Sequence, residues 1–213
     1  MFLSDRDLDW AIEQGRLIVE PRPTRIDPTS IDLRLDSIAE AKVWDVNGFQ
    51  KALAVSGVKA PELHLGSFKY GEFAERYLIP PPPEESADPD IRVVLRGKQV
   101  IVRPLGFLLW QTKERVGTPE EGADLICFVD GKSTRARTGI VIHLTAPTIH
   151  GGWNGKITLE IVNHGPFHFV LQEDDVIAQL TVAKLTSIPN RTMQVAGSAT
   201  LGQMAVTGQS VKN

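Results

Sequence analysis

The second half of the chain is a series of short apolar runs separated by turn residues, and this pattern constrains the fold most. From residue 91 onward, apolar and polar side chains alternate, and Gly, Pro, Asp or Asn repeatedly interrupts the alternation. A period of two is typical of half-buried strands, and regularly spaced turns favour a mainly β sandwich or barrel. The strands are expected within residues 91–97, 98–116, 123–131, 139–146, 156–165, 167–173 and 175–185.

The first residues predict a short helix followed by two strands. Ser4 and Asp7 have the spacing of a capping box, and Gly15 suits the end of a helix over residues 4–15. Strands are expected within residues 15–21 and 27–36, where apolar side chains again alternate with polar ones.

The region between these strands and residue 91 follows neither period. Residues 40–78 mix apolar, polar and aromatic side chains without a clear repeat. Four consecutive prolines at residues 80–83 remove backbone donors and fix φ, so residues 80–90 are expected to form a surface loop. We therefore predict a single β domain over residues 1–188 with an insertion around 40–90. The polar, Gly-rich residues 189–213 would form a tail and possible active-site lid.

Charge and cysteine content exclude several classes of protein. A net charge of −3 lacks the basic surplus expected of nucleic-acid or membrane-surface binders. No apolar run approaches the roughly 18 residues of a spanning helix, and the N-terminus lacks the apolar core of a signal peptide. A single cysteine excludes an internal disulfide and a cysteine-rich zinc site. The expectation is a cytoplasmic protein that binds neither nucleic acid nor a membrane.

The sequence "KITLEIV" at residues 156–162 places a glutamate in the middle of an apolar strand. Ile157, Leu159 and Ile161 fall on one face of the expected strand, and Glu160 falls on the other. Carboxylates are uncommon in strands and are costly to bury without a partner. Glu160 has three interpretations: a solvent-facing residue, half of a structural ion pair, or a catalytic base.

Two polar segments could bind a ligand. Residues 130–139, "DGKSTRARTG", combine Lys132 with hydroxyl groups and free backbone N–H groups, which suits either a phosphate cradle or an ordinary surface turn. Residues 145–160 place three glycines around Trp153, which could stack on a sugar or base or could cover the core from a hairpin.

The remaining metal or nucleophile candidates are weak. Four of the histidines lie at 143, 150, 164 and 168, with His143 on an expected strand. None has the spacing of a zinc motif, because both H-E-x-x-H and C-x-x-C are absent. Cys127 lies in an apolar strand and is interpreted as a core residue. No protein-bound metal is predicted.

These segments, in this order, resemble the dCTP deaminase branch of the trimeric dUTPase superfamily. The resemblance rests on "LSDRDL" and "GRL" near the N-terminus, "PTSIDLRL", "GKSTRAR", "TAPTIHGGWNGKITLE" and "VIAQL". The combination of "GKSxxxR" with "TLE" separates deaminases from plain dUTPases. The resemblance implies a distorted jelly-roll-like β barrel that assembles as a homotrimer, with active sites between neighbouring subunits.

The resemblance also implies roles for particular residues. Glu160 matches the general base and acid, and Ser133 and Arg137 match the groups that orient it and the attacking water. Residues that match substrate contacts are Lys132, Ser133, Thr134, Arg135, Ala136, Arg137, Leu144, Ala146, His150, Trp153, Thr158, Leu159, Gln179 and Gln203. Among these, Leu144 and Ala146 match the backbone that reads the base, and Gln203 matches the end of a closing C-terminal segment.

The implied reaction is hydrolysis of dCTP to dUTP and ammonia. Mg²⁺ would accompany the triphosphate rather than being caged by protein, and dTTP would be a possible inhibitor. Zinc nucleobase deaminases carry an H-x-E…P-C-x-x-C motif, which a chain with one cysteine cannot have. A metal-free route needs one carboxylate that accepts the proton of water and returns it, and Glu160 is the best-placed candidate.

Three positions depart from the family pattern. His150 replaces an aspartate that activates water in dUTPases, so the sequence favours a deaminase over a bifunctional enzyme or a dUTPase-like pyrophosphatase. Lys132 replaces an arginine, which keeps the charge but loses the fork. Ala199-Thr200 replaces a Lys-Tyr pair of the lid, and Arg191 is a candidate substitute. A non-catalytic nucleotide-binding trimer is a third alternative, motivated by the changed tail.

Overall fold

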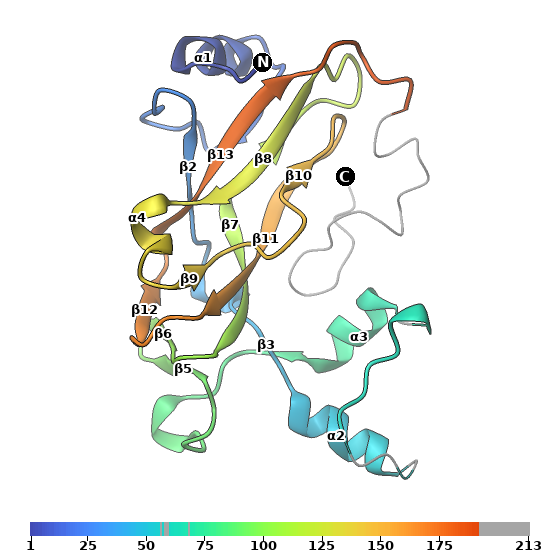
Figure 1. Cartoon of the computed structure of the whole chain (residues 1–213), viewed down its shortest axis with the longest axis vertical. Helices are drawn as coiled ribbons and strands as arrows, with labels where there is room; N and C mark the ends of the chain where they lie inside the picture. Colours follow the sequence, from blue (N-terminus) through green and yellow to red (C-terminus); the bar gives the residue numbers. More distant parts are fainter. Residues whose placement is uncertain (56, 58–59, 68, 192–213) are drawn as a thin grey trace.

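The computed structural model is a mainly β fold with a helical projection (Figure 1). It describes residues 1–55, 57, 60–67 and 69–191. The expected β architecture is confirmed, and most of the expected strands are present. Gln203, Ala199 and Thr200 lie outside the described residues, so the predicted lid is not described.

Two four-stranded antiparallel sheets supply most of the core. One sheet has the order β1 (Ile18–Glu20), β7 (Phe107–Gly117), β11 (Asn154–Asn163) and β9 (Ile140–Val141). The other has the order β10 (Thr148–Ile149), β8 (Leu125–Gly131), β13 (Val176–Lys184) and β2 (Ile31–Arg34). Alternate side chains of both sheets enter one buried cluster, which includes Leu33, Trp110, Leu159 and Leu180.

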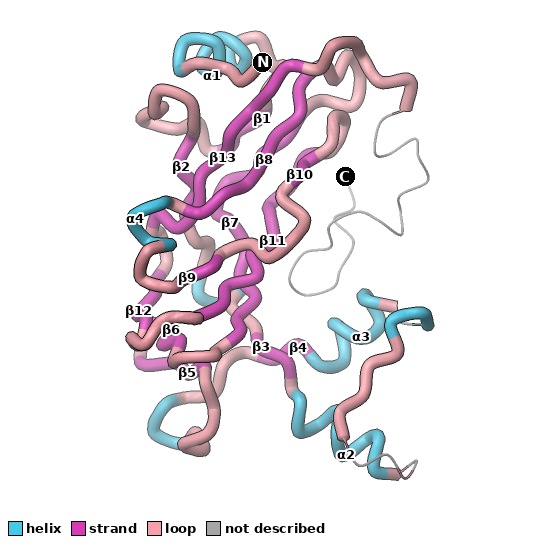
Figure 2. The backbone as a smooth tube through the Cα atoms, in the orientation of Figure 1, coloured by secondary structure: helices cyan, strands magenta, loops and turns pink. Residues whose placement is uncertain are grey.

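Two smaller sheets extend this barrel. One has the order β12 (Phe169–Gln172), β6 (Gln99–Val102) and β5 (Val93–Arg96), and the other pairs β3 (Val43–Trp44) with β4 (Leu78–Ile79). The latter pair forms the base from which the helices α2 (Val46–Ala54) and α3 (Tyr70–Tyr77) project (Figure 2). These elements give structure to the segment that had no clear sequence pattern.

The predicted N-terminal helix is confirmed as α1 (Asp5–Glu13). The Ser4 hydroxyl accepts a hydrogen bond from the Asp7 N–H, and the Asp7 carboxylate accepts one from the Ser4 N–H, which completes the capping box. Leu8 and Ala11 are buried against the core, and Gly15 has a φ of 67°, a conformation that glycine adopts without strain. Within the described residues, no helix is long and apolar enough to span a membrane.

Two strand predictions and one turn prediction need correction. The run 98–116 is two strands, because the chain turns at residues 103–106 with Leu105 at a φ of 66°. The run 139–146 forms a strand only at Ile140–Val141, so the prediction that His143 lies on a strand is wrong. The polar segment 130–139 contains a short helix, α4 (Ser133–Ala136), instead of a plain turn.

The proline-rich segment is close to the prediction. Residues 80–90 contain neither an α-helix nor a central strand, but one short 3-10 helix forms at Glu84–Ser86. Further 3-10 helices lie at Ile38–Glu40 and Leu65–Ser67.

Candidate functional site

Glu160 lies in the middle of β11, on the face opposite to the core. Its strand neighbours Leu159 and Ile161 are fully buried, whereas the Glu160 side chain is 31% exposed. This is the alternation that the sequence predicts for residues 156–162. Leu109 of β7 is directly opposite Glu160 in the antiparallel ladder. The strand ladder therefore fixes the backbone of Glu160 while its carboxylate remains accessible.

His143 is the side chain that lies against this carboxylate. Its Nδ1 atom lies 2.8 Å from Glu160 Oε2, and its side chain is 6% exposed. The contact is not aligned as a hydrogen bond, and neither buried ring nitrogen has an aligned partner among the described residues. The Leu144 N–H donates to the same carboxylate oxygen at 3.4 Å. The structure thus brings together Glu160 and the segment that was expected to read the base.

The His143 contact was not predicted, because no local spacing reveals it. His143 follows β9, which pairs with the end of β11 through Val141 and Val162. This pairing returns the chain toward Glu160 just after β9 ends. The contact could be predicted only if β9 and β11 were first assigned as neighbouring strands.

The Glu160 carboxylate raises the pKa of His143 above its ordinary value of 6.5, against the opposing effect of burial. The imidazolium form therefore contributes stability that is fully present below pH 6.5. That contribution is lost as the pH rises through the folded-state pKa. The Glu160→Gln substitution is expected to lower the His143 titration midpoint measured by NMR.

The matched control for this titration is Glu20→Gln. Glu20 is an exposed carboxylate of β1 that pairs with Arg115, away from His143. The Glu20→Gln substitution should leave the titration midpoint of His143 unchanged. Equal midpoints in wild type and Glu160→Gln would contradict the pairing.

The predicted phosphate segment is a separate, exposed cationic surface. Ser133, Thr134 and Arg137 are exposed around α4, and no ion pair of Arg135 or Arg137 is present in the described part of the chain. Ala136 is exposed as well. Unpaired guanidinium groups beside two hydroxyls are well suited to receive an anionic ligand.

Lys132 and Gln179 lie beside this surface. Lys132 forms an ion pair with Asp32, and its Nζ atom is 3.9 Å from Asp27 Oδ2. Gln179 in β13 is opposite Asp32 on one side and Asp130 on the other. The Lys132 ammonium is therefore occupied by carboxylates, and a phosphate would have to replace them.

Within one chain the two groups of predicted residues are not joined. No hydrogen bond or ion pair among the described residues connects Glu160 with Ser133 or Arg137. Ala146 and Thr158 lie on the Glu160 side, Ala146 in the loop after His143 and Thr158 in β11. The Leu159 side chain is fully buried in the core, so only its backbone could contact a ligand.

Trp153 and His150 belong to the turn before β11. The Trp153 ring packs against the core and lies close to Gly155, as the hairpin interpretation predicts. The Gly152 N–H donates to the Thr118 hydroxyl at 2.7 Å, which fixes this turn. His150 is exposed. The turn holds the tryptophan inward and leaves the histidine in solvent.

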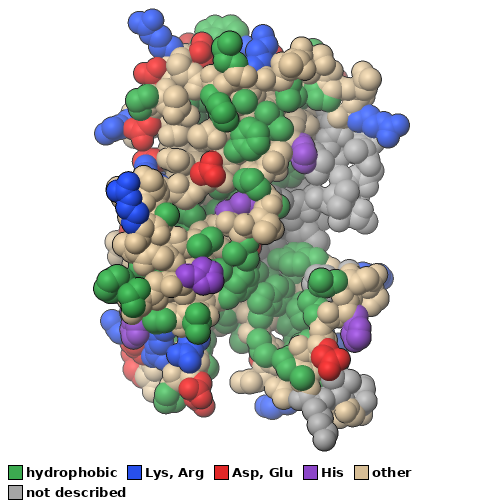
Figure 3. Space-filling view, in the orientation of Figure 1, with side chains coloured by type: hydrophobic (Ala, Val, Ile, Leu, Met, Phe, Trp, Pro, Cys, Tyr) green, Lys and Arg blue, Asp and Glu red, His purple; other side chains and the backbone are tan. Residues whose placement is uncertain are grey.

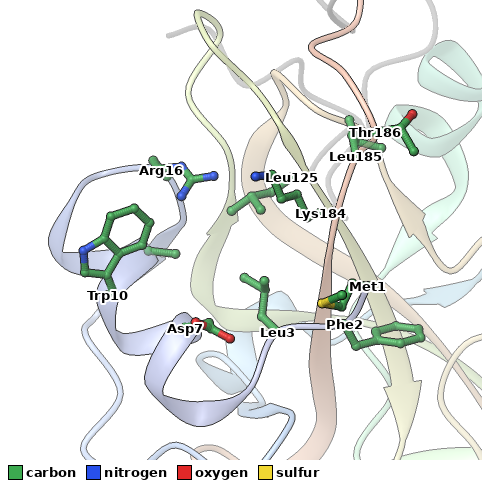
Figure 4. A pocket seen from close by; sticks show the side chains of 11 residues that line it. Met1, Phe2, Leu3, Asp7, Trp10, Arg16, Leu125, Lys184, Leu185 and Thr186 are labelled. Atoms are coloured by element: carbon green, nitrogen blue, oxygen red, sulfur yellow. The ribbon is translucent and has the colours of Figure 1, made fainter.

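One cavity lies away from these residues. It has a volume of about 610 Å³ and is lined by α1, the first residues and the end of β13 (Figure 4). Arg16 lies over the Trp10 ring at 4.9 Å from its centroid. None of the predicted site residues lines this cavity.

Cys127 fits the sequence interpretation of a core residue. Cys127 is fully buried in the core, and burial raises the pKa of its thiol to about 12, as expected for an unreactive core residue. No cluster of three His, Cys, Asp or Glu side chains that could hold a metal ion is found over the described ranges.

Comparison with known proteins gives a family. A family model described as dCTP deaminase-like matches residues 2–185. The chain belongs to the dCTP deaminase-like family. A dCTP deaminase of Marinomonas sp. is 32% identical over 193 residues, covering 90% of this chain and 87% of the relative. A "dCTP deaminase, dUMP-forming" of Halobacterium salinarum is 31% identical over 196 residues, covering 90% and 84%.

A solved structure supports the fold of this family member. The 2'-deoxycytidine 5'-triphosphate deaminase of Agrobacterium tumefaciens aligns with a TM-score of 0.54 and 17% identity. The alignment covers 89% of this chain and 49% of the solved chain. At this identity the likeness concerns the fold alone, and it confirms the jelly-roll-like class that the sequence resemblance implied.

Proposed function

We propose that the chain hydrolyses dCTP to dUTP and ammonia, with Glu160 as general base and general acid. The observation that carries this proposal is the placement of Glu160. It is a partly exposed carboxylate on a central strand, next to the Leu144 N–H and a buried histidine. Membership of the dCTP deaminase-like family gives this arrangement its substrate class.

In the proposed reaction Glu160 carries one proton from water to ammonia. The carboxylate accepts a proton as the water oxygen bonds to C4 of cytosine. It then returns that proton to the amino nitrogen, the C4–N bond breaks and ammonia leaves, while the second proton of water shifts from O4 to N3 to give the uracil ring of dUTP. A positioned carboxylate of this kind typically accelerates proton transfer by about 10²–10⁴-fold. The exposed loop around Leu144 and Ala146 would bind the base edge through its backbone.

The triphosphate would lie against the α4 surface of a neighbouring subunit. Arg135 and Arg137 supply charge there, and Ser133 and Thr134 supply hydroxyl donors. In this arrangement Ser133 and Arg137 would orient Glu160 and water across a homotrimer interface. Mg²⁺ would accompany the triphosphate, because phosphate oxygens are the hard ligands that this ion prefers.

Formation of dUMP is the second candidate function, because relatives with both names match this chain about equally well. His150 stands where the family pattern has an aspartate, so the chain offers no carboxylate at that position for phosphate hydrolysis. We therefore favour dUTP as the product. Inhibition by dTTP and closure by residues 189–213 remain parts of the same proposal.

The test is product analysis of the purified protein with Mg²⁺ and, separately, dCTP, dCMP, CTP and dUTP. We expect ammonia and dUTP in equal amounts from dCTP, with no pyrophosphate. Pyrophosphate and dUMP would instead establish the bifunctional reaction. Nucleotide binding without turnover of any substrate would contradict both enzymes and favour a binding trimer.

A further inference from the structure

The insertion leaves the barrel beside Glu160. Lys42 exchanges two backbone hydrogen bonds with Leu109, at 2.8 and 2.9 Å, and Leu109 is opposite Glu160 on its other side. Lys42, Leu109 and Glu160 thus form one row across the sheet. Directly paired residues lie on the same face of a sheet, and two such steps span about 10 Å between Cα atoms. The face that carries Glu160 is therefore the face from which the insertion starts.

The residues that follow build an aromatic cluster on this face. The chain stays extended through β3, so Trp44 falls on the same side as Lys42. The Tyr70 ring meets the Trp44 ring edge-on, with centroids 6.1 Å apart and an interplanar angle of 89°. Phe73 packs on Trp44 from the next turn of α3, at 5.1 Å. Hydrophobic side chains are gathered where the insertion meets the barrel (Figure 3).

The same cluster lines a cavity of about 400 Å³ between α2, α3 and the loop at residues 61–63. Tyr70 lies at the start of α3 and forms part of this wall. Its ring is half-buried and held by Trp44, so the direction of its hydroxyl is restricted. A phenol fixed in this way is a more precise donor than a surface side chain would be, because little rotational freedom remains.

The row of Lys42, Leu109 and Glu160 places the cluster that contains Tyr70 on the face that carries Glu160. Burial, and then the nearby negative charge of Glu160, raise the pKa of this phenol above its ordinary value. Glu160 is the only charged group among the described residues that contributes to this shift. The phenol therefore stays neutral and keeps its proton at physiological pH, so that it can act as a hydrogen-bond donor.

We propose that Tyr70 is a positioning residue that approaches the Glu160 carboxylate from the insertion and restrains it in the orientation for proton transfer. His143 contacts the same carboxylate from the loop after β9. Glu160 would then be held between a histidine of the barrel and a tyrosine of the insertion. This gives a function to a segment that the family resemblance leaves unexplained, and its catalytic part rests on the proposed deamination.

The kinetic test compares Tyr70→Phe with Tyr77→Phe. Tyr77 belongs to the same aromatic cluster, because its ring packs on Phe49 and Phe73. Each variant therefore loses one hydroxyl from this cluster and keeps the ring. Tyr70→Phe is expected to lower kcat for ammonia release by about tenfold, comparable with losing one polar contact to a charged group. Its KM for dCTP should stay within twofold. Tyr77→Phe should leave both constants unchanged, and equal effects of the two variants would overturn the proposal.

A second measurement does not depend on turnover. The chain has only 2 tyrosines, so the Tyr77→Phe protein reports tyrosinate formation by Tyr70 alone. Adding Glu160→Gln to that protein should lower the pH at which Tyr70 ionises, whereas adding Glu20→Gln should not. If Glu160→Gln leaves the pH at which Tyr70 ionises unchanged, the proposed pairing of Tyr70 with Glu160 is overturned. If the titration responds but wild type releases no ammonia, the pairing stands and the proposed deamination is wrong.

Discussion

Replacing Glu160 by glutamine is expected to lower kcat for ammonia release from dCTP by about 10²–10⁴-fold, the usual contribution of a general acid–base group. The amide has nearly the shape of the carboxylate but cannot accept the proton of water. The backbone of Glu160 is fixed by pairing with β7, and its side chain is 31% exposed, so the strand should tolerate the change. The measurement is single-turnover ammonia release with saturating dCTP and Mg²⁺.

Two further observations keep this result interpretable. The Kd of the variant for dCTP should stay within a few-fold of wild type, because binding of the triphosphate would depend on the α4 surface. The Glu20→Gln protein should keep full activity, since Glu20 lies on β1 and pairs with Arg115. Full activity of Glu160→Gln would eliminate the proposed mechanism while leaving the family assignment unaffected.

The strands of the second half could be predicted because their signal is local. In β11 the side chains alternate between core and surface as "KITLEIV" indicates. A period of two therefore predicts that Glu160 lies on the outer face of the strand. The turn at residues 103–106 carries the turn signals Pro104 and Gly106, but the sequence analysis had placed it inside one longer run. There Leu105 adopts a positive φ, which hydrophobic patterning does not report. Helix α4 was missed because four residues are too few to show a helical period.

The surroundings of Glu160 could not be predicted in the same way. His143 reaches it through the pairing of β9 with β11, and Tyr70 reaches its surroundings through the pairing of Lys42 with Leu109. Both placements depend on which strands become neighbours, not on sequence spacing. The family resemblance supplied Glu160, Ser133 and Arg137 as a set, but the motifs that carry it lie outside residues 40–90. The aromatic cluster was therefore visible only in the folded chain.

Trimers that combine two inactive variants are expected to recover activity. The proposed site takes Glu160 from one subunit and Ser133 and Arg137 from the next, and the described contacts within one chain do not join them. Arg137→Ala should be strongly impaired alone, because an exposed guanidinium that orients water and phosphate is lost. Glu160→Gln is expected to be strongly impaired for the separate reason given above. In the proposed shared site the two defects would lie on opposite sides of the subunit interface.

Co-expression of the two variants with different affinity tags, followed by purification on both tags, yields trimers that contain each chain at least once. In a cyclic trimer, either composition has one interface with Glu160 and Arg137 both intact, so about one third of the wild-type kcat per trimer should return. Two differently tagged Glu160→Gln chains taken through the same procedure should remain inactive. If both groups act from one chain, every site is defective and nothing is recovered. The recovered fraction therefore measures directly whether the site is shared between subunits.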